Sequence, residues 1–430
     1  MTDLEATLAS IAPAFAYRDG RLHADATPLD AIADAANGPV YAYALNAIAD
    51  AYQDFADAFA GQPTRICYAL KANDSVGVLK TLLAKGAGVD VVSGGELALA
   101  LSAGASADKI VFSGVGKTNQ ELADALDAAV MQINVESEAE LERLNQVAVS
   151  KGVQAPIALR VNPDVDAGTL DAISTGRATD KFGVNYGDAE RLYQEAARAP
   201  GLKPMGIAMH IGSQIGDVAH SAAACAKLRT LWDRLAVDGV TLRRFDVGGG
   251  LGIRYKDETP PSIQAYADTI RAAVADIDCE VMLEPGRRIV GPAGVLIANV
   301  IGEKMSGDHR VIILDAAMND LIRPALYKAW HEVVPLTLPA GDAEWTAADI
   351  VGPICESTDK FADSRMMPPI AAGDRVAFLA AGAYGAVMAS EYNGRPRTPE
   401  VVVQGQNWDF ARKPRTYQDL IQEQSAPDWI

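Results

Sequence analysis

Eight strand-like runs alternate with helical stretches between residues 64 and 284, and this alternation limits the folds the chain can adopt. Strands that alternate with helices form a parallel sheet. Eight such units fit the usual size of a (β/α)₈ TIM barrel, about 250 residues. The α/β class and this barrel are therefore predicted, with a doubly wound open sheet as the alternative. The eight expected strands are Thr64–Lys71, Gly88–Val92, Lys109–Ser113, Met131–Val135, Pro156–Asn162, Pro204–His210, Phe245–Gly248 and Glu280–Glu284.

A second, mostly antiparallel β domain, of sandwich or barrel type, is expected after Gly294, where the long helices are lost. Turn residues separate its β-rich runs. Val40–Leu45 is surplus to the eight barrel strands and is expected to join this domain, whereas residues 1–37 look irregular. We therefore expect a barrel over 46–291 and a β domain formed by 1–45 and 292–430. Its expected later strands are Val295–Val300, Arg310–Leu314, Val333–Leu338, Arg375–Ala380 and Glu400–Val403.

The composition excludes several classes of partner. The net charge is −18, from 38 basic and 56 acidic residues, which argues against nucleic acid and anionic membranes. No signal peptide and no uninterrupted apolar run of about 18 residues is evident, so no membrane span is expected. The four cysteines are far apart and form no metal-type pair, which predicts no metal site and fits a reducing cytoplasm.

Lys71 follows a β-rich run and precedes the helix-start signal Asp74-Ser75. A lysine at the carboxyl end of a barrel strand can face a pocket rather than bulk solvent. Burial there would lower its pKa and make the neutral amine available as a nucleophile. For a lysine considered alone, a solvated position is the simpler interpretation.

Three further strand ends carry chemical signals. The sixth ends in His210, followed by Gly212 and Ser213, and the eighth ends in Glu284-Pro285-Gly286-Arg287. The seventh runs into Gly248-Gly249-Gly250-Leu251-Gly252, whose backbone N–H groups could approach an anion closely. It is not the dinucleotide fingerprint, because Ile253 stands where the last glycine is required. A lysine, a flat histidine, a glycine-rich anion cradle and a carboxylate together suit pyridoxal phosphate.

Several motifs, spread in order over residues 66 to 397, resemble those of the diaminopimelate decarboxylase family, within the alanine racemase-like group of pyridoxal-phosphate enzymes. That family's fold is a barrel plus a β domain that contains both chain ends. The matching stretches are Tyr68–Asn73, Val91–Glu96, Ile173–Gly176 with Lys181–Gly183, His210–Gln214, Gly248–Gly252, Glu284–Arg287, Ile322–Tyr327, Gly352–Asp359 and Gly382–Gly385.

The resemblance implies a role for each candidate residue. Lys71 would form the Schiff base with pyridoxal 5′-phosphate, Glu284 would pair with the pyridine nitrogen, and His210 would stack on the ring. Cys355 would be the acid that reprotonates the substrate carbon, in the active site of the partner subunit of a homodimer. A free thiol is largely protonated at neutral pH and can deliver a proton. The remaining cofactor-binding residues would be Asp90, Ser213, Gly249, Gly250, Gly286, Arg287 and Tyr384, and the substrate-binding residues Arg287, Arg323, Tyr327, Glu356 and Tyr384.

The implied reaction converts meso-2,6-diaminopimelate to L-lysine and carbon dioxide, the last step of lysine biosynthesis. The far end of this substrate carries both a carboxylate and an ammonium. Arg323 and Tyr327 are spaced i and i+4, hence on one helix face, and an arginine fork binds a carboxylate by two hydrogen bonds. Glu356 would supply the anion for the ammonium.

Two alternatives remain. One is a fold-related decarboxylase of ornithine, arginine or carboxynorspermidine, for which an acidic residue would be expected where Arg323 stands. The other is a non-catalytic homologue that binds the cofactor, which would be expected to lack Lys71 or Cys355.

Overall fold

The computed structural model describes residues 3–165 and 181–429 and divides into two compact units. The barrel unit comprises Ala49–Ile253 and Thr259–Arg288. The sheet unit comprises Met1–Ile48, Arg254–Glu258 and Ile289–Ile430. Each is described by itself.

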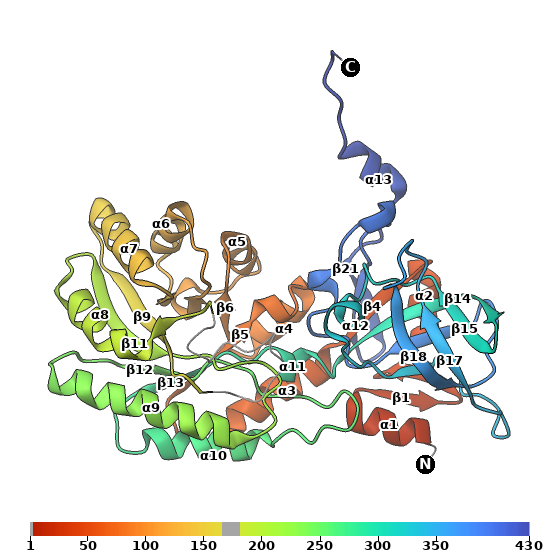
Figure 1. The fold of residues 1–430 in the computed structure, drawn as a ribbon, viewed down its shortest axis with the longest axis horizontal. Helices are drawn as coiled ribbons and strands as arrows, with labels where there is room; N and C mark the ends of the chain where they lie inside the picture. The colour runs from red at the N-terminus through yellow and green to blue at the C-terminus, as the bar shows by residue number, and fades with distance from the viewer. Residues whose placement is uncertain (1–2, 166–180, 430) are drawn as a thin grey trace. The chain divides into compact units, whose positions relative to one another are not determined.

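The barrel unit contains a closed ring of eight parallel strands (Figure 1). The ring closes because β13 pairs with β5 and β8 pairs with β9, which rules out the open sheet and confirms the predicted TIM barrel. A short strand, β10 (Val184–Asn185), adds to β9 outside the ring. The ring strands are β5 (Thr64–Ala69), β6 (Gly88–Val91), β7 (Ile110–Phe112), β8 (Gln132–Val135), β9 (Ala155–Asn162), β11 (Leu202–Ala208), β12 (Arg244–Asp246) and β13 (Glu280–Leu283).

The helices of this unit lie outside the ring (Figure 1). Ser93, Thr118, Ser137 and Ser262 each cap a helix by accepting the N–H of the residue three positions on, which explains where these helices begin. Cys67 of β5, Val111 of β7, Met282 of β13 and Met131, which precedes β8, form a buried apolar cluster. The helices are α4 (Val76–Ala84), α5 (Gly94–Ser102), α6 (Asn119–Ala128), α7 (Glu138–Lys151), α8 (Tyr186–Arg198), α9 (Val218–Val237) and α10 (Ile263–Val274). Two more helices, α3 (Leu45–Ala58) and α11 (Arg287–Val290), each have residues in both units.

The sheet unit is built on a mixed sheet around β14, which pairs antiparallel with β4, β15 and β19. The strand expected over 40–45 is β4, and it pairs with both β14 and β20. All pairs are antiparallel except β15 with β17 and β4 with β20. The strands are β4 (Val40–Ala44), β14 (Gly294–Ser306), β15 (His309–Leu314), β16 (Val333–Pro335), β17 (Thr346–Val351), β18 (Lys360–Met367), β19 (Arg375–Phe378), β20 (Glu400–Gln404) and β21 (Asn407–Arg412).

The expectation that residues 1–37 are irregular was wrong. They form α1 (Asp3–Ile11), a three-stranded sheet and α2 (Leu29–Ala36). Asp19 and Gly20, both at positive φ, close a two-residue hairpin between β1 (Phe15–Arg18) and β2 (Arg21–Ala24), with β3 (Thr27–Pro28) beside it. An Asp-Gly pair is typical of this type of turn, but the flanking strands are too short to show clear alternation.

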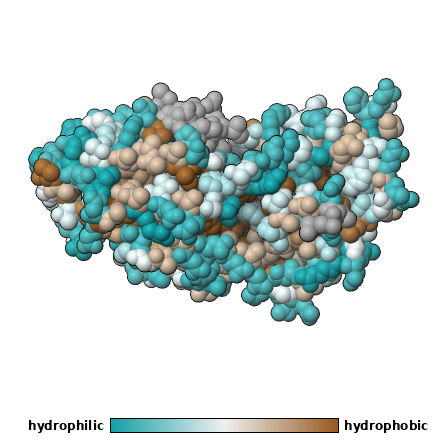
Figure 2. All heavy atoms as spheres, turned by 90° about the horizontal axis from the view of Figure 1, so that it is seen from below, coloured by the Kyte–Doolittle hydropathy of each residue, from teal (hydrophilic) through white to brown (hydrophobic). Residues whose placement is uncertain are grey.

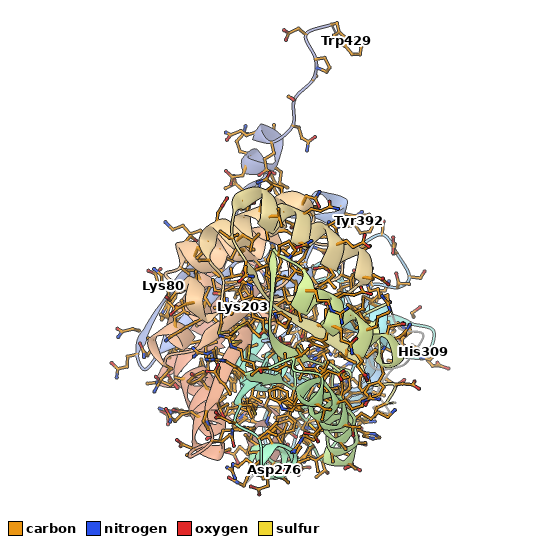
Figure 3. The ribbon with its side chains drawn as sticks, turned by 90° about the vertical axis from the view of Figure 1, so that its left-hand side faces the viewer. Lys80, Lys203, Asp276, His309, Tyr392 and Trp429 are labelled. Atoms are coloured by element: carbon orange, nitrogen blue, oxygen red, sulfur yellow. The ribbon has the colours of Figure 1, made fainter. Side chains whose placement is uncertain are left out.

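Figure 2 shows a largely hydrophilic face on which apolar residues form only scattered patches. After β21 the chain forms the short helix α13 (Tyr417–Gln422) and then projects outward to Trp429, which is 83% exposed (Figures 1 and 3). No helix in the described ranges is long and apolar enough to cross a membrane.

Lys117 fixes the strand ends at one side of the barrel. Its buried Nζ donates to the carbonyls of Gly114, at 2.6 Å, and Asn134, at 2.8 Å, and to the Glu140 carboxylate at 2.7 Å. These bonds join the segment after β7 to β8 and α7. A buried ion pair of this kind is destabilising to break, because the remaining charge is left without compensation.

We predict that Lys117→Ala lowers the free energy of unfolding by about 3–5 kcal/mol, since Glu140 would lose its buried partner. The matched control is Lys151→Ala, which breaks the exposed pair with Asp127 and should change stability by about 0–1 kcal/mol. Urea unfolding of both variants measures the difference. Similar small losses in the two variants would contradict this role of Lys117.

Candidate active site

A pocket of about 350 Å³ opens at the carboxyl ends of the barrel strands. Its lining includes three of the predicted residues, Lys71, His210 and Glu284. Asn134 and Arg160 also line it, although the sequence did not single them out. The barrel therefore brings together residues from five separate strand ends, as the strand order requires.

Lys71 lies in a short 3₁₀ turn, Leu70–Ala72, directly after β5. The strand ends two residues earlier than predicted, so the lysine belongs to the turn that leaves the barrel. Its Nζ lies 2.8 Å from Oδ2 of Asp90, which is fully buried on the neighbouring strand β6. Ala69 is paired with Asp90 in the ladder, so the register of β5 and β6 sets this contact.

Glu284 and Asp246 form a buried acidic pair at the ends of β13 and β12. The Asn134 Nδ2 lies 3.3 Å from Glu284 and 3.4 Å from Asp246, so one amide bridges both carboxyl groups. Burial raises the pKa of Asp246 to about 6. Burial raises the pKa of Glu284 well above its usual value, and the charges of Asp246 and Asp90 raise it further. A cation placed beside Glu284 would favour its ionised form.

His210 is held in a neutral form. The Gly249 N–H donates to its Nδ1 at 3.2 Å, so that nitrogen acts as an acceptor. Burial lowers the pKa of His210 well below its usual value, and the charges of Arg160 and Lys71 lower it further. A neutral ring beside the pocket can stack on a planar ligand without adding charge.

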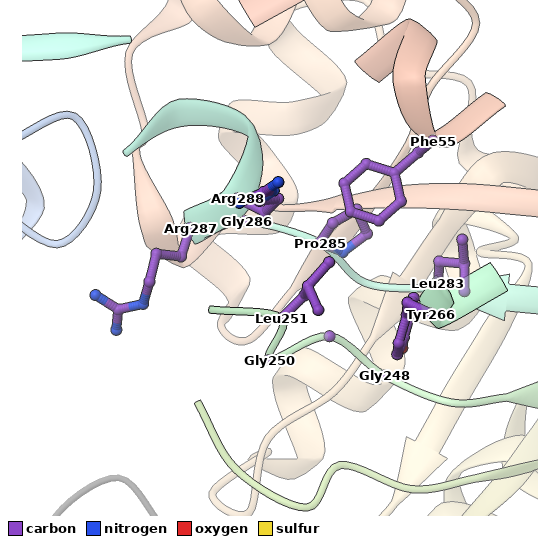
Figure 4. A pocket seen from close by; sticks show the side chains of 11 residues that line it. Phe55, Gly248, Gly250, Leu251, Tyr266, Leu283, Pro285, Gly286, Arg287 and Arg288 are labelled. Carbon is purple, nitrogen blue, oxygen red and sulfur yellow. The ribbon is translucent and has the colours of Figure 1, made fainter. Parts of the chain in front are cut away.

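The glycine-rich turn after β12 permits very close backbone packing. A Cβ on Gly249 would lie 2.1 Å from the Glu284 carbonyl oxygen, and one on Gly250 would lie 2.2 Å from that of Gly212. Gly250 also has a φ of +103°. Behind this turn, Phe55 and Tyr266 enclose a cavity of about 10 Å³, which is too small for an organic ligand (Figure 4). The turn therefore has no room for side chains at Gly249 and Gly250.

The segment Pro285-Gly286-Arg287 is bound to the strand that precedes Lys71. The Ala69 N–H donates to the Pro285 carbonyl, and a Cβ on Gly286 would meet that of Ala72 at 2.8 Å. The buried Arg287 donates from Nη2 to Ser213 Oγ at 3.0 Å. Figure 4 shows its side chain directed away from the apolar lining. Ser213 and Arg287 thus form a polar pair from two strand ends.

The other predicted residues belong to the sheet unit. Arg323 and Tyr327 are the first and last residues of the one-turn helix α12, where Arg323 is buried and Tyr327 half-buried. Tyr384 is half-buried in a turn and has a φ of +55°. Gly382 makes this turn possible, because a Cβ there would lie 1.9 Å from the Val290 carbonyl oxygen.

Cys355 and Glu356 are exposed on a well-braced loop of the sheet unit. The buried Asp359 accepts the N–H groups of Ile354, at 2.6 Å, and Met318, at 2.7 Å. Two residues of a neighbouring turn, Tyr392 and Asn393, also hold the loop. The Asn393 side chain accepts the Cys355 N–H at 3.1 Å, and the Tyr392 hydroxyl, at the surface in Figure 3, donates to Glu356 at 2.7 Å. Hydrogen bonds from Tyr392 and Thr358 lower the pKa of Glu356.

Sequence reasoning missed the buried partners of the predicted residues. Asn134 alternates with apolar neighbours in Gln132-Ile133-Asn134-Val135, which is a signal for polar groups facing the barrel interior. Asp246 stands directly before the glycine-rich motif, yet only the closed barrel shows its proximity to Glu284. The stretch Ile173–Gly176 lies outside the described residues. In the described ranges, no three His, Cys, Asp or Glu side chains are grouped to hold a metal ion.

Comparisons with known proteins agree with this geometry. Residues 45–291 match the family described as "Pyridoxal-dependent decarboxylase, pyridoxal binding domain". A diaminopimelate decarboxylase of Pseudomonas fluorescens is 47% identical over 413 residues, which cover 96% of this chain and 99% of that protein. The chain belongs to the diaminopimelate decarboxylase family.

Two solved structures agree with this family assignment. Helicobacter pylori diaminopimelate decarboxylase, complexed with L-lysine, superposes on this chain with a TM-score of 0.88 at 38% sequence identity. The match covers 92% of this chain and 98% of the H. pylori chain. The M. jannaschii enzyme, also complexed with L-lysine, gives a TM-score of 0.91 at 32% sequence identity, and the match covers 96% of this chain and 98% of the M. jannaschii chain. The family uses pyridoxal 5′-phosphate, and the residues of the barrel pocket fit that group. Lys71 offers an amine, and Glu284 offers a buried carboxyl group whose ionised form a cation would favour. Gly249 and Gly250, in the turn after β12, offer backbone without side chains.

We predict that Gly250→Ala weakens binding of pyridoxal 5′-phosphate by about tenfold or more, because the added Cβ would force the glycine turn to move. Gly216→Ala is the control, since a Cβ at that position meets nothing within 4 Å. Titration of each cofactor-free variant, followed by visible absorbance, gives the dissociation constants. Equal affinities in the two variants would exclude a cofactor cradle at this turn.

Proposed function

We propose that this protein decarboxylates meso-2,6-diaminopimelate to L-lysine and carbon dioxide, the last step of lysine biosynthesis. The observation that carries the proposal is the barrel pocket, in which Lys71, His210 and Glu284 converge as a pyridoxal-phosphate enzyme requires. The family membership and the relatives crystallised with L-lysine support the choice of substrate. The four free cysteines and the acidic charge fit the cytoplasm, where we place the enzyme.

The barrel residues would hold the cofactor and keep it in one orientation. When bound, pyridoxal 5′-phosphate supplies an electron sink for the pair left behind as carbon dioxide departs. Lys71 would form the covalent link, and Asp90 would hold its Nζ in position beforehand. Glu284 would pair with the ring nitrogen, and His210 would cover one face of the ring. Ser213, Gly249, Gly250, Gly286 and Arg287 would bind the phosphate, and Tyr384 would close over it.

Gly249 and Gly250, in the turn after β12, would have different roles. The Gly249 N–H donates to His210 Nδ1, so Gly249 fixes the plane of the histidine ring. Gly249 would therefore serve the phosphate site mainly by having no side chain, because a Cβ at this position would clash with the Glu284 carbonyl. We propose that the backbone of Gly250, which precedes the apolar Leu251, approaches the phosphate more closely than that of Gly249.

The sheet unit would supply the groups that recognise the far end of the substrate. Arg323 would bind the distal carboxylate together with Tyr327, and Arg287 of the barrel unit would also contact the substrate. Glu356 would bind the distal ammonium, and its lowered pKa keeps it anionic at neutral pH. A pocket for ornithine would need only acids, so the buried arginine favours diaminopimelate over a basic amino acid.

We infer that Cys355 protonates the substrate carbon in the partner subunit of a homodimer. The hydrogen bonds of its loop support this role, because they hold Cys355 and Glu356 in place while both residues stay exposed. An exposed thiol on a fixed loop is suited to a site completed by a second chain. A cysteine that serves only packing is usually buried, as Cys67, Cys225 and Cys279 are here.

We predict carbon dioxide release from meso-diaminopimelate, and much slower release from ornithine, arginine and lysine, when the purified protein is supplied with pyridoxal 5′-phosphate. Lys71→Ala should lose the visible absorbance of lysine-bound cofactor and nearly all activity. Trapped carbon dioxide and absorbance spectra are the measurements. Release from ornithine or arginine instead would favour a related decarboxylase. Bound cofactor without release from any amino acid would favour a non-catalytic homologue.

We predict that Lys71→Ala and Cys355→Ala complement each other. Each variant alone should be nearly inactive. After they are unfolded together and refolded, about a quarter of wild-type activity should return, because half of the dimers are mixed and each mixed dimer has one intact site. Refolded Lys71→Ala alone is the control for activity. Mixed dimers without activity would mean that Cys355 serves its own subunit or has no catalytic role.

A further inference from the structure

Arg323 is held by two neutral side chains of its own unit. Its Nη1 donates to the Tyr255 hydroxyl at 2.8 Å and lies 3.1 Å from His331 Nε2. The guanidinium carbon lies 4.6 Å from the centre of the Tyr255 ring. All three residues are at most 6% exposed. With both Nη1 hydrogens engaged, the plane of the guanidinium is fixed by the protein itself.

The hydrogen bonds of His331 define which of its nitrogens carries the proton. Nδ1 lies 2.9 Å from the Leu379 carbonyl oxygen, which can only accept, so Nδ1 carries the hydrogen. Nε2 of the neutral ring is then an acceptor, which is what the arginine requires, because a guanidinium has donors alone. The backbone carbonyl of His331 is in turn bound by Arg365 at 3.0 Å. His331 is thus anchored on two sides and presents one lone pair to Arg323.

Tyr255 reaches this cluster from the short segment Arg254–Glu258, which belongs to the sheet unit although its chain neighbours on both sides belong to the barrel unit. Glu258 holds the segment by accepting the N–H groups of Tyr255, at 2.9 Å, and Lys256, at 2.7 Å. The Tyr255 ring meets the His331 ring edge-on, with centres 5.3 Å apart. Tyrosine and histidine therefore support each other as well as the arginine.

We propose that Tyr255 and His331 are positioning residues that orient Arg323 toward the carboxylate at the far end of the substrate. This inference rests on the proposed function, in which Arg323 reads that carboxylate. A bidentate bond needs both the position and the plane of the guanidinium to be fixed. The two anchors fix both without introducing a negative charge that would compete with the ligand.

The test uses two ligands that differ by one carboxylate. L-Lysine and cadaverine have the same five-carbon chain and two amino groups, and only L-lysine carries the carboxylate. The ratio of the cadaverine Kd to the L-lysine Kd therefore measures how much the carboxylate contributes to binding affinity. Calorimetry on the protein loaded with pyridoxal 5′-phosphate gives both constants. Arg323→Ala sets the baseline and should lower the ratio by about 30-fold or more.

Tyr255→Phe and His331→Asn should each lower the ratio by about tenfold while leaving the cadaverine Kd near the wild-type value. Phenylalanine keeps the ring but loses the hydroxyl, whereas asparagine keeps a donor for Leu379 but does not reach Arg323. His331→Gln is the matched variant, because its amide oxygen reaches the Nε2 position, and it should restore most of the ratio. Thermal unfolding checks that each variant is folded, and Tyr255→Phe, which keeps the core volume, remains informative if His331→Asn does not fold.

The outcomes separate this inference from the proposal on which it rests. If Arg323→Ala keeps the wild-type ratio, Arg323 does not read the carboxylate, and both ideas fail. If Arg323→Ala loses the ratio while Tyr255→Phe and His331→Asn keep it, only the positioning role is overturned. A parallel loss of L-lysine and cadaverine affinity would show a general structural role and would also overturn it.

Discussion

Three carboxyl groups buried at one end of the barrel set the conditions for everything else in its pocket. Asp90, Asp246 and Glu284 come from three different strands, and their negative charges repel one another in a region that water does not screen. Lys71 compensates Asp90, and the Asn134 amide bridges the other two. Burial raises the pKa values of Asp246 and Glu284, and the charges of the neighbouring carboxylates raise them further. A cationic ring nitrogen would relieve this repulsion, so the acids favour a bound cofactor that carries one.

Close packing of the backbone explains the glycines in the turn after β12. The turns after β11, β12 and β13 pack directly against one another, so a Cβ at Gly249 or Gly250 would overlap a carbonyl oxygen of a neighbouring turn. The obstacle in each case is backbone rather than a flexible side chain, so it cannot move aside cheaply. The motif Gly248–Gly252 therefore has a packing role at three strand ends, besides the phosphate binding that we propose for it.

The barrel could be predicted from the sequence because its strands are short apolar runs separated by capped helices. The parts that were missed follow from weaker local signals. Buried and exposed residues do not alternate regularly in β17 and β18, and β21 has no buried residue, so hydrophobicity did not distinguish these strands from loops. The buried partners could not be foreseen for another reason. The link from Asn134 to Glu284 joins residues 150 positions apart, and only closure of the ring brings them together.

Charge differs between the barrel end, which the proposed function assigns to the cofactor, and Arg323, which it assigns to the far end of the substrate. At the barrel end, buried acids without enough cations make the protein itself favour a cationic ligand. In the sheet unit, the bonds to the Arg323 Nη1 come from a phenol and a neutral imidazole, which orient the guanidinium without neutralising it. An aspartate in place of His331 would hold the arginine as firmly but would satisfy its charge, and a carboxylate ligand would then have to compete. The Leu379 carbonyl accepts the Nδ1 hydrogen of His331, so Nε2 offers Arg323 a lone pair and adds no negative charge at this contact.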